Sequence, residues 1–193
     1  MLDDLDSSLQ QLLLQELPDF QRSTETALGI CFDPPLEGLI RQKPAINLFL
    51  YDVRENLDLR NAEWSVERRA NGTAVKKRPP ARIDCSYMVT VWTSTEDPQQ
   101  EHHLLGQLMR LLLTYRTLPE AVLQGSLRGQ EPLPVTTGLR SNYLQSLGEF
   151  WQAMGGRPKV ALSYTVTIAV PVEQGAIEAP LVLERNFGLH STR

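Results

Sequence analysis

The segment Ile46–Val53 constrains the fold of this chain more than any other. Six of its eight residues are apolar, and only Asn47 and Asp52 interrupt the pattern. Because successive side chains of a strand point to opposite faces, a strand of this kind has to be covered on both sides. We therefore expect it in the middle of a sheet, with other elements packed against each face.

Other segments show the alternation that is typical of strands. Residues 83–92 predict a long, half-buried strand in a second central position, and residues 160–170 alternate strictly until Pro171. Residues 27–32 predict a short strand, and residues 181–184 a possible edge strand. Together these segments predict a mixed sheet of about four or more strands.

A charged β-hairpin is predicted between the two central strands. Residues 63–69 and 73–78 flank Asn71-Gly72, and both residues of this pair readily adopt the positive φ that a two-residue turn requires. The hairpin holds the one basic concentration in a chain whose net charge is −4. Its basic residues are Arg68, Arg69, Lys76, Lys77 and Arg78.

Helical patterns occupy much of the remaining chain. Residues 2–17 repeat leucine at the spacing of one helical face, and residues 98–115 form a wide apolar stripe after Thr95 or Asp97, either of which can cap the helix. A short helical segment is expected at residues 119–124, followed by an irregular connection. A last helix begins at Ser141 or Asn142 and ends at Gly155-Gly156.

These elements predict one α+β domain with helices packed on a mixed sheet and a protruding β-hairpin. We expect the domain to span residues 1–172 and residues 173–193 to form a C-terminal extension. No apolar run reaches the roughly 18 to 20 residues needed to span a bilayer, and the N-terminus is acidic rather than basic. The chain is therefore expected to fold in the cytoplasm.

The sequence contains no motif of catalysis, and we predict no enzyme, no catalytic residue, no cofactor and no metal ligand. His102 and His103 are adjacent, so they point in different directions from a helix and are expected on its wet face. Cys31 and Cys85 are expected to be buried free thiols. GxSxG, GxxxxGK[ST] and HExxH are all missing from the sequence.

Three interpretations of the basic hairpin remain open. A solvated hairpin can protect a sheet edge without any further role. Nucleic-acid binding usually needs aromatic residues among the charges, and only Trp64 is near, while the net charge of −4 offers no general attraction to nucleic acid. The third interpretation is docking on an acidic protein surface.

Several segments resemble the N-terminal domain of the cap, or tail-terminator, proteins of extracellular contractile injection systems. The most specific is NLFLYDVREN, residues 47–56. The others follow in the order that the family shows, and the resemblance covers roughly residues 1–172. They are Val66–Arg69, Arg78–Pro80, Cys85–Tyr87, Glu101–Leu105, Leu118–Glu120, Leu123–Gly125, Glu149–Trp151 and Leu162–Ile168.

The resemblance implies a structural role in a phage-tail-like particle. Proteins of this family form a ring, usually of six, at the distal end of the inner tube and contractile sheath, where they end polymerisation and couple sheath to tube. The implied partners are further copies of the chain, the tube protein and the sheath protein, without nucleic acid or membrane insertion. The particle is then released or anchored.

Within this hypothesis we expect the charged hairpin to contact the tube, the sheath or the next subunit. A second patch is expected at Arg54 and Glu55. The full set of candidate contact residues is Arg54, Glu55, Trp64, Arg68, Arg69, Lys76, Lys77 and Arg78. The alternative function is a soluble carbohydrate- or peptide-binding module, whose aromatic surface would draw on Trp64, Trp92 or Trp151.

Overall fold

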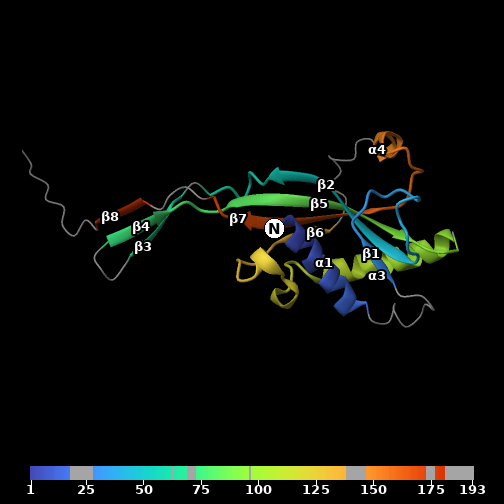
Figure 1. Ribbon diagram of the computed structural model, residues 1–193, viewed down its shortest axis with the longest axis horizontal. Coiled ribbons are helices and arrows are strands. Elements are labelled where there is room, and N and C mark those ends of the chain that lie inside the picture. Colours follow the sequence, from blue (N-terminus) through green and yellow to red (C-terminus); the bar gives the residue numbers. More distant parts are fainter. Residues whose placement is uncertain are drawn as a thin grey trace, which may run out of the picture.

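The chain folds into a body and an arm (Figure 1). The body is a five-stranded sheet with helices, and the arm is a three-stranded sheet that extends from one end of it. The computed structural model describes residues 1–17, 28–61, 63–68, 73–95, 97–137, 147–172 and 177–180.

The body sheet has the strand order β1-β2-β5-β7-β6. Strands β1 and β2 are parallel, and the other neighbours are antiparallel, so the predicted mixed sheet is confirmed. Two of its strands, β1 and β6, have only three residues each. The strands are β1 (Gly29–Cys31), β2 (Ala45–Glu55), β5 (Ala81–Trp92), β6 (Val135–Thr137) and β7 (Leu162–Val170).

The two predicted central strands are confirmed, because β2 lies between β1 and β5, and β5 lies between β2 and β7. The expectation that β5 is half-buried is wrong, since all nine residues from Asp84 to Trp92 are buried. Its second face carries Met88 and Trp92 among hydroxyl side chains. At one end of this face Trp92 packs with Ile40 of the loop before β2, and at the other end Asp84 accepts from Asn56 and Thr167. The alternation in the sequence does not reveal these contacts.

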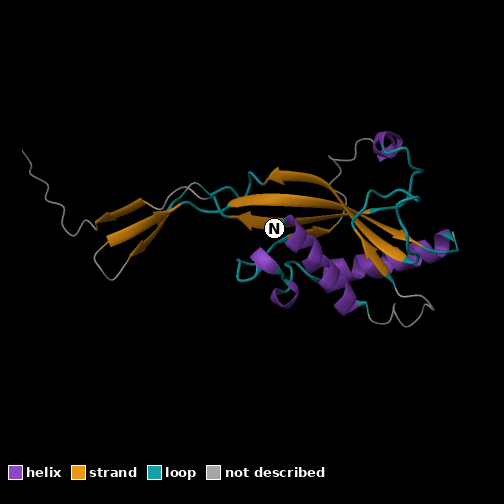
Figure 2. Ribbon diagram, in the orientation of Figure 1, coloured by secondary structure: helices purple, strands orange, loops and turns teal. Residues whose placement is uncertain are grey.

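Two long helices cover one face of the body sheet (Figure 2). They are α1 (Leu2–Glu16) and α3 (Pro98–Thr114), and the N-cap of α3 is Asp97, whose side chain accepts a hydrogen bond from the Gln99 N–H at 2.9 Å. Two short turns, η1 (Glu120–Val122) and η2 (Gly125–Leu127), follow α3. The core contains leucines from both helices and the inward residues of β2, β5 and β7, among them Leu9, Leu108, Leu48, Tyr87 and Val166.

The helix α4 (Leu147–Ala153) packs on the opposite face of the sheet, at the end away from the arm (Figure 1). Its Phe150 ring lies 6.4 Å from that of Phe49, and Trp151 is 1% exposed. Gly155 ends the helix with φ of 68°, as the sequence predicts. The predicted start at residue 141 or 142 lies outside the described residues.

The arm contains the predicted hairpin. Strand β3 (Ser65–Arg68) pairs with β4 (Thr73–Lys77), while the Asn-Gly turn lies outside the described residues. A third strand, β8 (Ile177–Pro180), pairs with the other side of β4. The sequence predicts an edge strand slightly later, at residues 181–184, which the structure does not describe.

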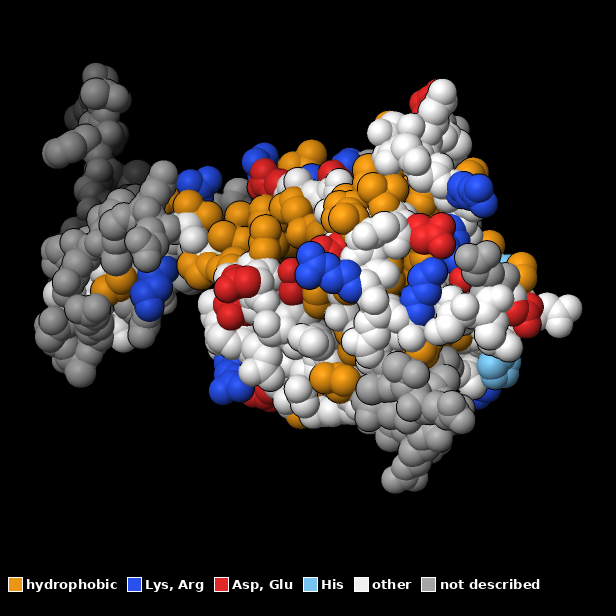
Figure 3. Space-filling model, turned by 45° about the vertical axis from the view of Figure 1, so that its right-hand side comes forward, with side chains coloured by type: hydrophobic (Ala, Val, Ile, Leu, Met, Phe, Trp, Pro, Cys, Tyr) orange, Lys and Arg blue, Asp and Glu red, His pale blue; other side chains and the backbone are white. Residues whose placement is uncertain are grey.

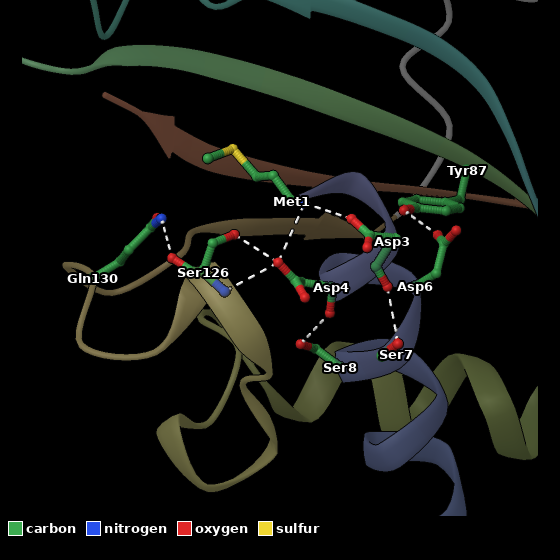
Figure 4. A network of polar contacts seen from close by, with 9 residues as sticks. All are labelled: Met1, Asp3, Asp4, Asp6, Ser7, Ser8, Tyr87, Ser126 and Gln130. Atoms are coloured by element: carbon green, nitrogen blue, oxygen red, sulfur yellow. Dashed lines mark hydrogen bonds and ion pairs between the residues drawn. The ribbon is translucent and has the colours of Figure 1, made fainter. Parts of the chain in front are cut away.

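Polar contacts attach the start of α1 to the turn η2 (Figure 4). The backbone N–H and hydroxyl of Ser126 donate to Asp4 Oδ2 at 3.0 and 2.6 Å. Nearby, the buried Tyr87 hydroxyl donates to Asp6 Oδ1 at 2.8 Å. Gly125 has φ of +50°, and a Cβ at this position would lie 1.9 Å from Asp4 Oδ1. The close approach of helix and turn therefore requires glycine.

Candidate functional site

The two faces of the arm differ in character. Val66 pairs with Lys76 and Arg68 pairs with Ala74 across β3 and β4, and directly paired residues share a face. The face that carries Val66, Arg68, Ala74 and Lys76 is called the mixed face, because it presents two apolar side chains beside two cations. Lys77, one residue further along β4, points to the other face.

Trp64 extends the mixed face. It comes two residues before Val66, and the Lys76 Nζ lies 5.1 Å from the centroid of its ring, a cation–π contact. Val66 itself is 60% exposed, which is unusual for a valine in a strand. Arg68 and Arg78 are exposed, while Arg69 lies outside the described residues.

The second predicted patch lies at the end of β2 where the chain leaves the body for the arm. Arg54 Nε donates to Asp52 Oδ2, and Glu55 accepts two hydrogen bonds from Arg60, at 2.9 and 2.8 Å. Both residues of the patch are therefore held by charged neighbours of the same chain. Their side chains still reach solvent, with exposures of 43% and 35%.

A pocket of about 290 Å³ opens beside this patch, on the sheet face opposite α1 and α3. Asp52, Arg54 and Asp84 contribute to its wall, together with hydroxyl side chains of β5 and β7. Ser86 Oγ lies 3.1 Å from Thr165 Oγ1 across these strands. The acidic residues that line the pocket are Asp52, Glu55, Asp58 and Asp84, against the single cation Arg54.

The rim of the pocket is an ordered turn. Asn56 donates through Nδ2 to both carboxylate oxygens of Asp84, at 3.0 and 3.1 Å, and its own Oδ1 accepts from the Leu59 N–H at 3.0 Å. Thr167 also donates to Asp84, at 2.6 Å. Asp84, only 8% exposed, thus anchors the turn, which presents Leu57 at 68% exposure.

The three tryptophans of the alternative function do not share one surface. Trp64 belongs to the arm and Trp151 to the core under α4. Trp92 is 8% exposed, lines a depression of about 720 Å³ and lies under the ammonium groups of Lys43 and Lys159, at 5.8 and 4.5 Å. The aromatic surface expected for a carbohydrate is therefore not assembled from these residues.

Residues that could have suggested chemistry occupy ordinary positions. His102 and His103 are exposed on α3, as predicted. Cys85 is buried and Cys31 half-buried, both as free thiols, and burial raises the pKa of Cys85 to about 12 and that of Cys31 to about 11. Among the described residues, no group of three or more His, Cys, Asp or Glu side chains could hold a metal ion. Within the same part of the chain, no helix has the length and apolar character for a membrane span.

Sequence reasoning missed the pocket and the mixed face. The pocket draws on β2, the turn after it, β5 and β7, so its members are scattered along the sequence. The mixed face cannot be read from the sequence, because a two-residue turn at Asn71-Gly72 would pair Arg68 with Val75, whereas the structure pairs Arg68 with Ala74. This shift of one residue places Lys76, and not Lys77, on the face of Val66.

The body and arm together are similar to two solved structures. One is an extracellular contractile injection system, the PVC sheath/tube terminator in its extended state, with 26% identity and a TM-score of 0.70 over 100% of this chain. The other is the anti-feeding prophage cap, described as the AFP tube terminating cap, with 25% identity and a TM-score of 0.66 over 98% of this chain. This chain spans 64% and 62% of the length of those two chains.

The family comparison agrees with the structural one. No curated protein matches the chain. The model of the Pvc16 N-terminal domain, however, matches residues 4–184, which include every strand of the body and of the arm and all but the first two residues of α1. The chain therefore belongs to the Pvc16 N-terminal domain family.

Proposed function

We propose that this protein is a terminator, or cap, at the end of the inner tube and contractile sheath of an extracellular injection particle. The observation that carries the proposal is similarity over almost the whole chain to two terminators, at TM-scores of 0.70 and 0.66. The family match over residues 4–184 supports it independently of the structural comparison.

A terminator acts mechanically and needs no catalytic group. A helical stack of identical rings continues to grow as long as its last ring offers the surface that the next one binds. A protein that binds this surface and does not present it again ends the growth. The same contacts attach the sheath to the tube at that end.

The partners we propose are further copies of the chain in a ring, six in number, together with the tube and sheath proteins. The arm suits such contacts because it extends from the body and carries exposed cations on a three-stranded sheet (Figure 3). Arg54, Glu55 and Trp64 lie at or near its base, and Arg68, Lys76, Lys77 and Arg78 on or directly after its strands. We propose that these residues, with Arg69, form the contact surface.

The deciding experiment compares particles with and without this chain by electron microscopy. Particles that lack the chain should show tubes or sheaths of uncontrolled length. Controlled lengths and normal ends without the chain would contradict the proposal.

A second experiment tests the contact surface separately. Replacing Arg68, Arg69, Lys76 and Lys77 with glutamate should leave the monomer folded, because the described side chains among them are exposed, but should prevent capping. The circular dichroism spectrum is the control for folding. Normal cap occupancy with this variant would exclude the arm as the contact surface and leave the terminator role intact.

A further inference from the structure

The pocket beside the arm lies on a part of the sheet that α1 and α3 do not cover. Its wall residues Asp84 and Ser86 alternate along β5 with Cys85 and Tyr87, which point into the core. At this end of the body, one face of β5 is therefore buried in the apolar core and the other face carries polar side chains.

The charges of the pocket and of the arm are opposite. Four carboxylates and one guanidinium line the pocket, but Asp52 pairs with Arg54, Glu55 pairs with Arg60, and the buried Asp84 accepts from Asn56 and Thr167. Asp58 is exposed on the rim of the pocket, and Arg68 and Lys76 project from the mixed face of the arm. Complementary charges of this kind steer association and select one partner over others. An acidic lining is common on solvated surfaces, and it is the exposed apolar side chains beside it that distinguish this pocket.

Each of the two surfaces also carries one exposed apolar side chain. Leu57 on the pocket rim is 68% exposed and Val66 at the centre of the mixed face is 60% exposed, and these are the two highest values among the large apolar side chains that the structure describes. Leu57 belongs to a turn held by Asn56, so its exposure is built into the structure. Each surface therefore presents one apolar side chain among charges, with opposite signs on the two surfaces.

We propose that the pocket receives the mixed face of the arm of a second copy of this chain. In this contact Val66 lies against Leu57, and Arg68 and Lys76 lie against Asp58 on the rim of the pocket. A chain's own arm points away from its body, so the contact joins different copies (Figure 1). Because the two surfaces are different patches, the copies join head to tail, and such a contact forms a ring when the rotation between successive copies closes. The inference rests on the proposed function, for which it identifies the contact between neighbouring subunits.

Disulfide trapping in the full chain tests the contact directly. Asp58→Cys in one preparation is mixed with Arg68→Cys in a second, differently tagged one, and the disulfide-linked heterodimer is measured on non-reducing gels. The matched control replaces Arg68→Cys by Lys77→Cys, which lies on the opposite face of the same arm. We expect several-fold more heterodimer with Arg68→Cys, and equal amounts would overturn the proposal.

Charge exchange tests the electrostatic part. Asp58→Lys alone, and Arg68→Glu with Lys76→Glu, should each weaken association by about tenfold or more in sedimentation experiments. Combining all three substitutions in one chain should restore association, because the charge at position 58 is again opposite to the charges at positions 68 and 76. A combined variant that associates as weakly as its parents would overturn the proposal. Thermal melts of each variant verify that it is folded.

The experiments distinguish failure of the pocket contact from failure of the proposed function. If trapping fails while particles without the chain grow tubes of uncontrolled length, the pocket contact is wrong and the terminator role stands. If tube length stays controlled without the chain, the terminator role is wrong whatever the gels show.

Discussion

Gly125 provides a quantitative test of how the N-terminal helix is attached to the body. Its φ of +50° lies in the left-handed region, where an alanine costs about 1–2 kcal/mol. An alanine Cβ would also lie 1.9 Å from Asp4 Oδ1 and 2.3 Å from Asp4 Cγ, so the Asp4 side chain, with its hydrogen bonds from Ser126, or the helix or turn has to move. Overpacking of this kind adds about 1–3 kcal/mol.

Gly129 separates these two effects. It has φ of +73° and no atom within 4 Å of a Cβ position, so Gly129→Ala carries the backbone cost alone. We therefore expect Gly125→Ala to lower the free energy of unfolding by about 1–3 kcal/mol more than Gly129→Ala does. Urea denaturation measures both, and an unchanged m value indicates that the unfolding transition is comparable.

The Asp4→Ala background completes the cycle. Without the Asp4 carboxylate, the contacts at 1.9 and 2.3 Å no longer exist, so the extra cost of Gly125→Ala should disappear. Equal costs for Gly125→Ala and Gly129→Ala in the unmodified chain would refute the reasoning, as would an extra cost that persists in the Asp4→Ala background.

Three further predictions concern single side chains. The hydroxyl and backbone N–H of Ser126 hold the pKa of Asp4 at about 2, below its value of about 3.9 in an unfolded chain, so this contribution to stability is present above about pH 4 and lost toward pH 2. Urea midpoints across this range should show the loss, and Asp4→Asn should reduce it. With pKa values of about 12 and 11, Cys85 and Cys31 should resist a thiol reagent at about pH 8 until the protein is unfolded. Rapid labelling of the native protein would contradict their burial. Trp151→Ala should lower the free energy of unfolding by about 3–5 kcal/mol, because the side chain is 1% exposed; a thermal melt like that of the unmodified chain would argue against packing of α4 on the sheet.

Periodicity predicts the positions of the long strands well, although not the burial of each face, as the second face of β5 and the 47% exposure of Val53 show. Strand β2 is apolar on both faces and β7 alternates strictly, and both lie where the patterns indicate. The three-residue β1 lies within the strand predicted at residues 27–32, but periodicity does not predict the equally short β6 or the four-residue β8. Each of these two pairs with a longer neighbour, β7 or β4, whose hydrogen bonds establish it as a strand.

The sequence predicts one half of the proposed contact surface and not the other. The basic residues of the hairpin are visible in the sequence because they are neighbours along the chain. The acidic pocket depends on residues as distant as Asp58 and Thr165, which only the register of the sheet brings together. The resemblance identifies the family but does not assign roles to these residues.

Strand β8 has a consequence for experiments that shorten the chain. A truncation after Val172 removes β8 and leaves one side of β4 without its partner strand. The N–H and C=O groups exposed in this way form an edge that can recruit strands from other chains. Such a truncation would confound the loss of a C-terminal segment with a new tendency to aggregate. A cut after Pro180 keeps the register from Thr73 to Lys76 intact, so it tests the residues beyond the arm by themselves.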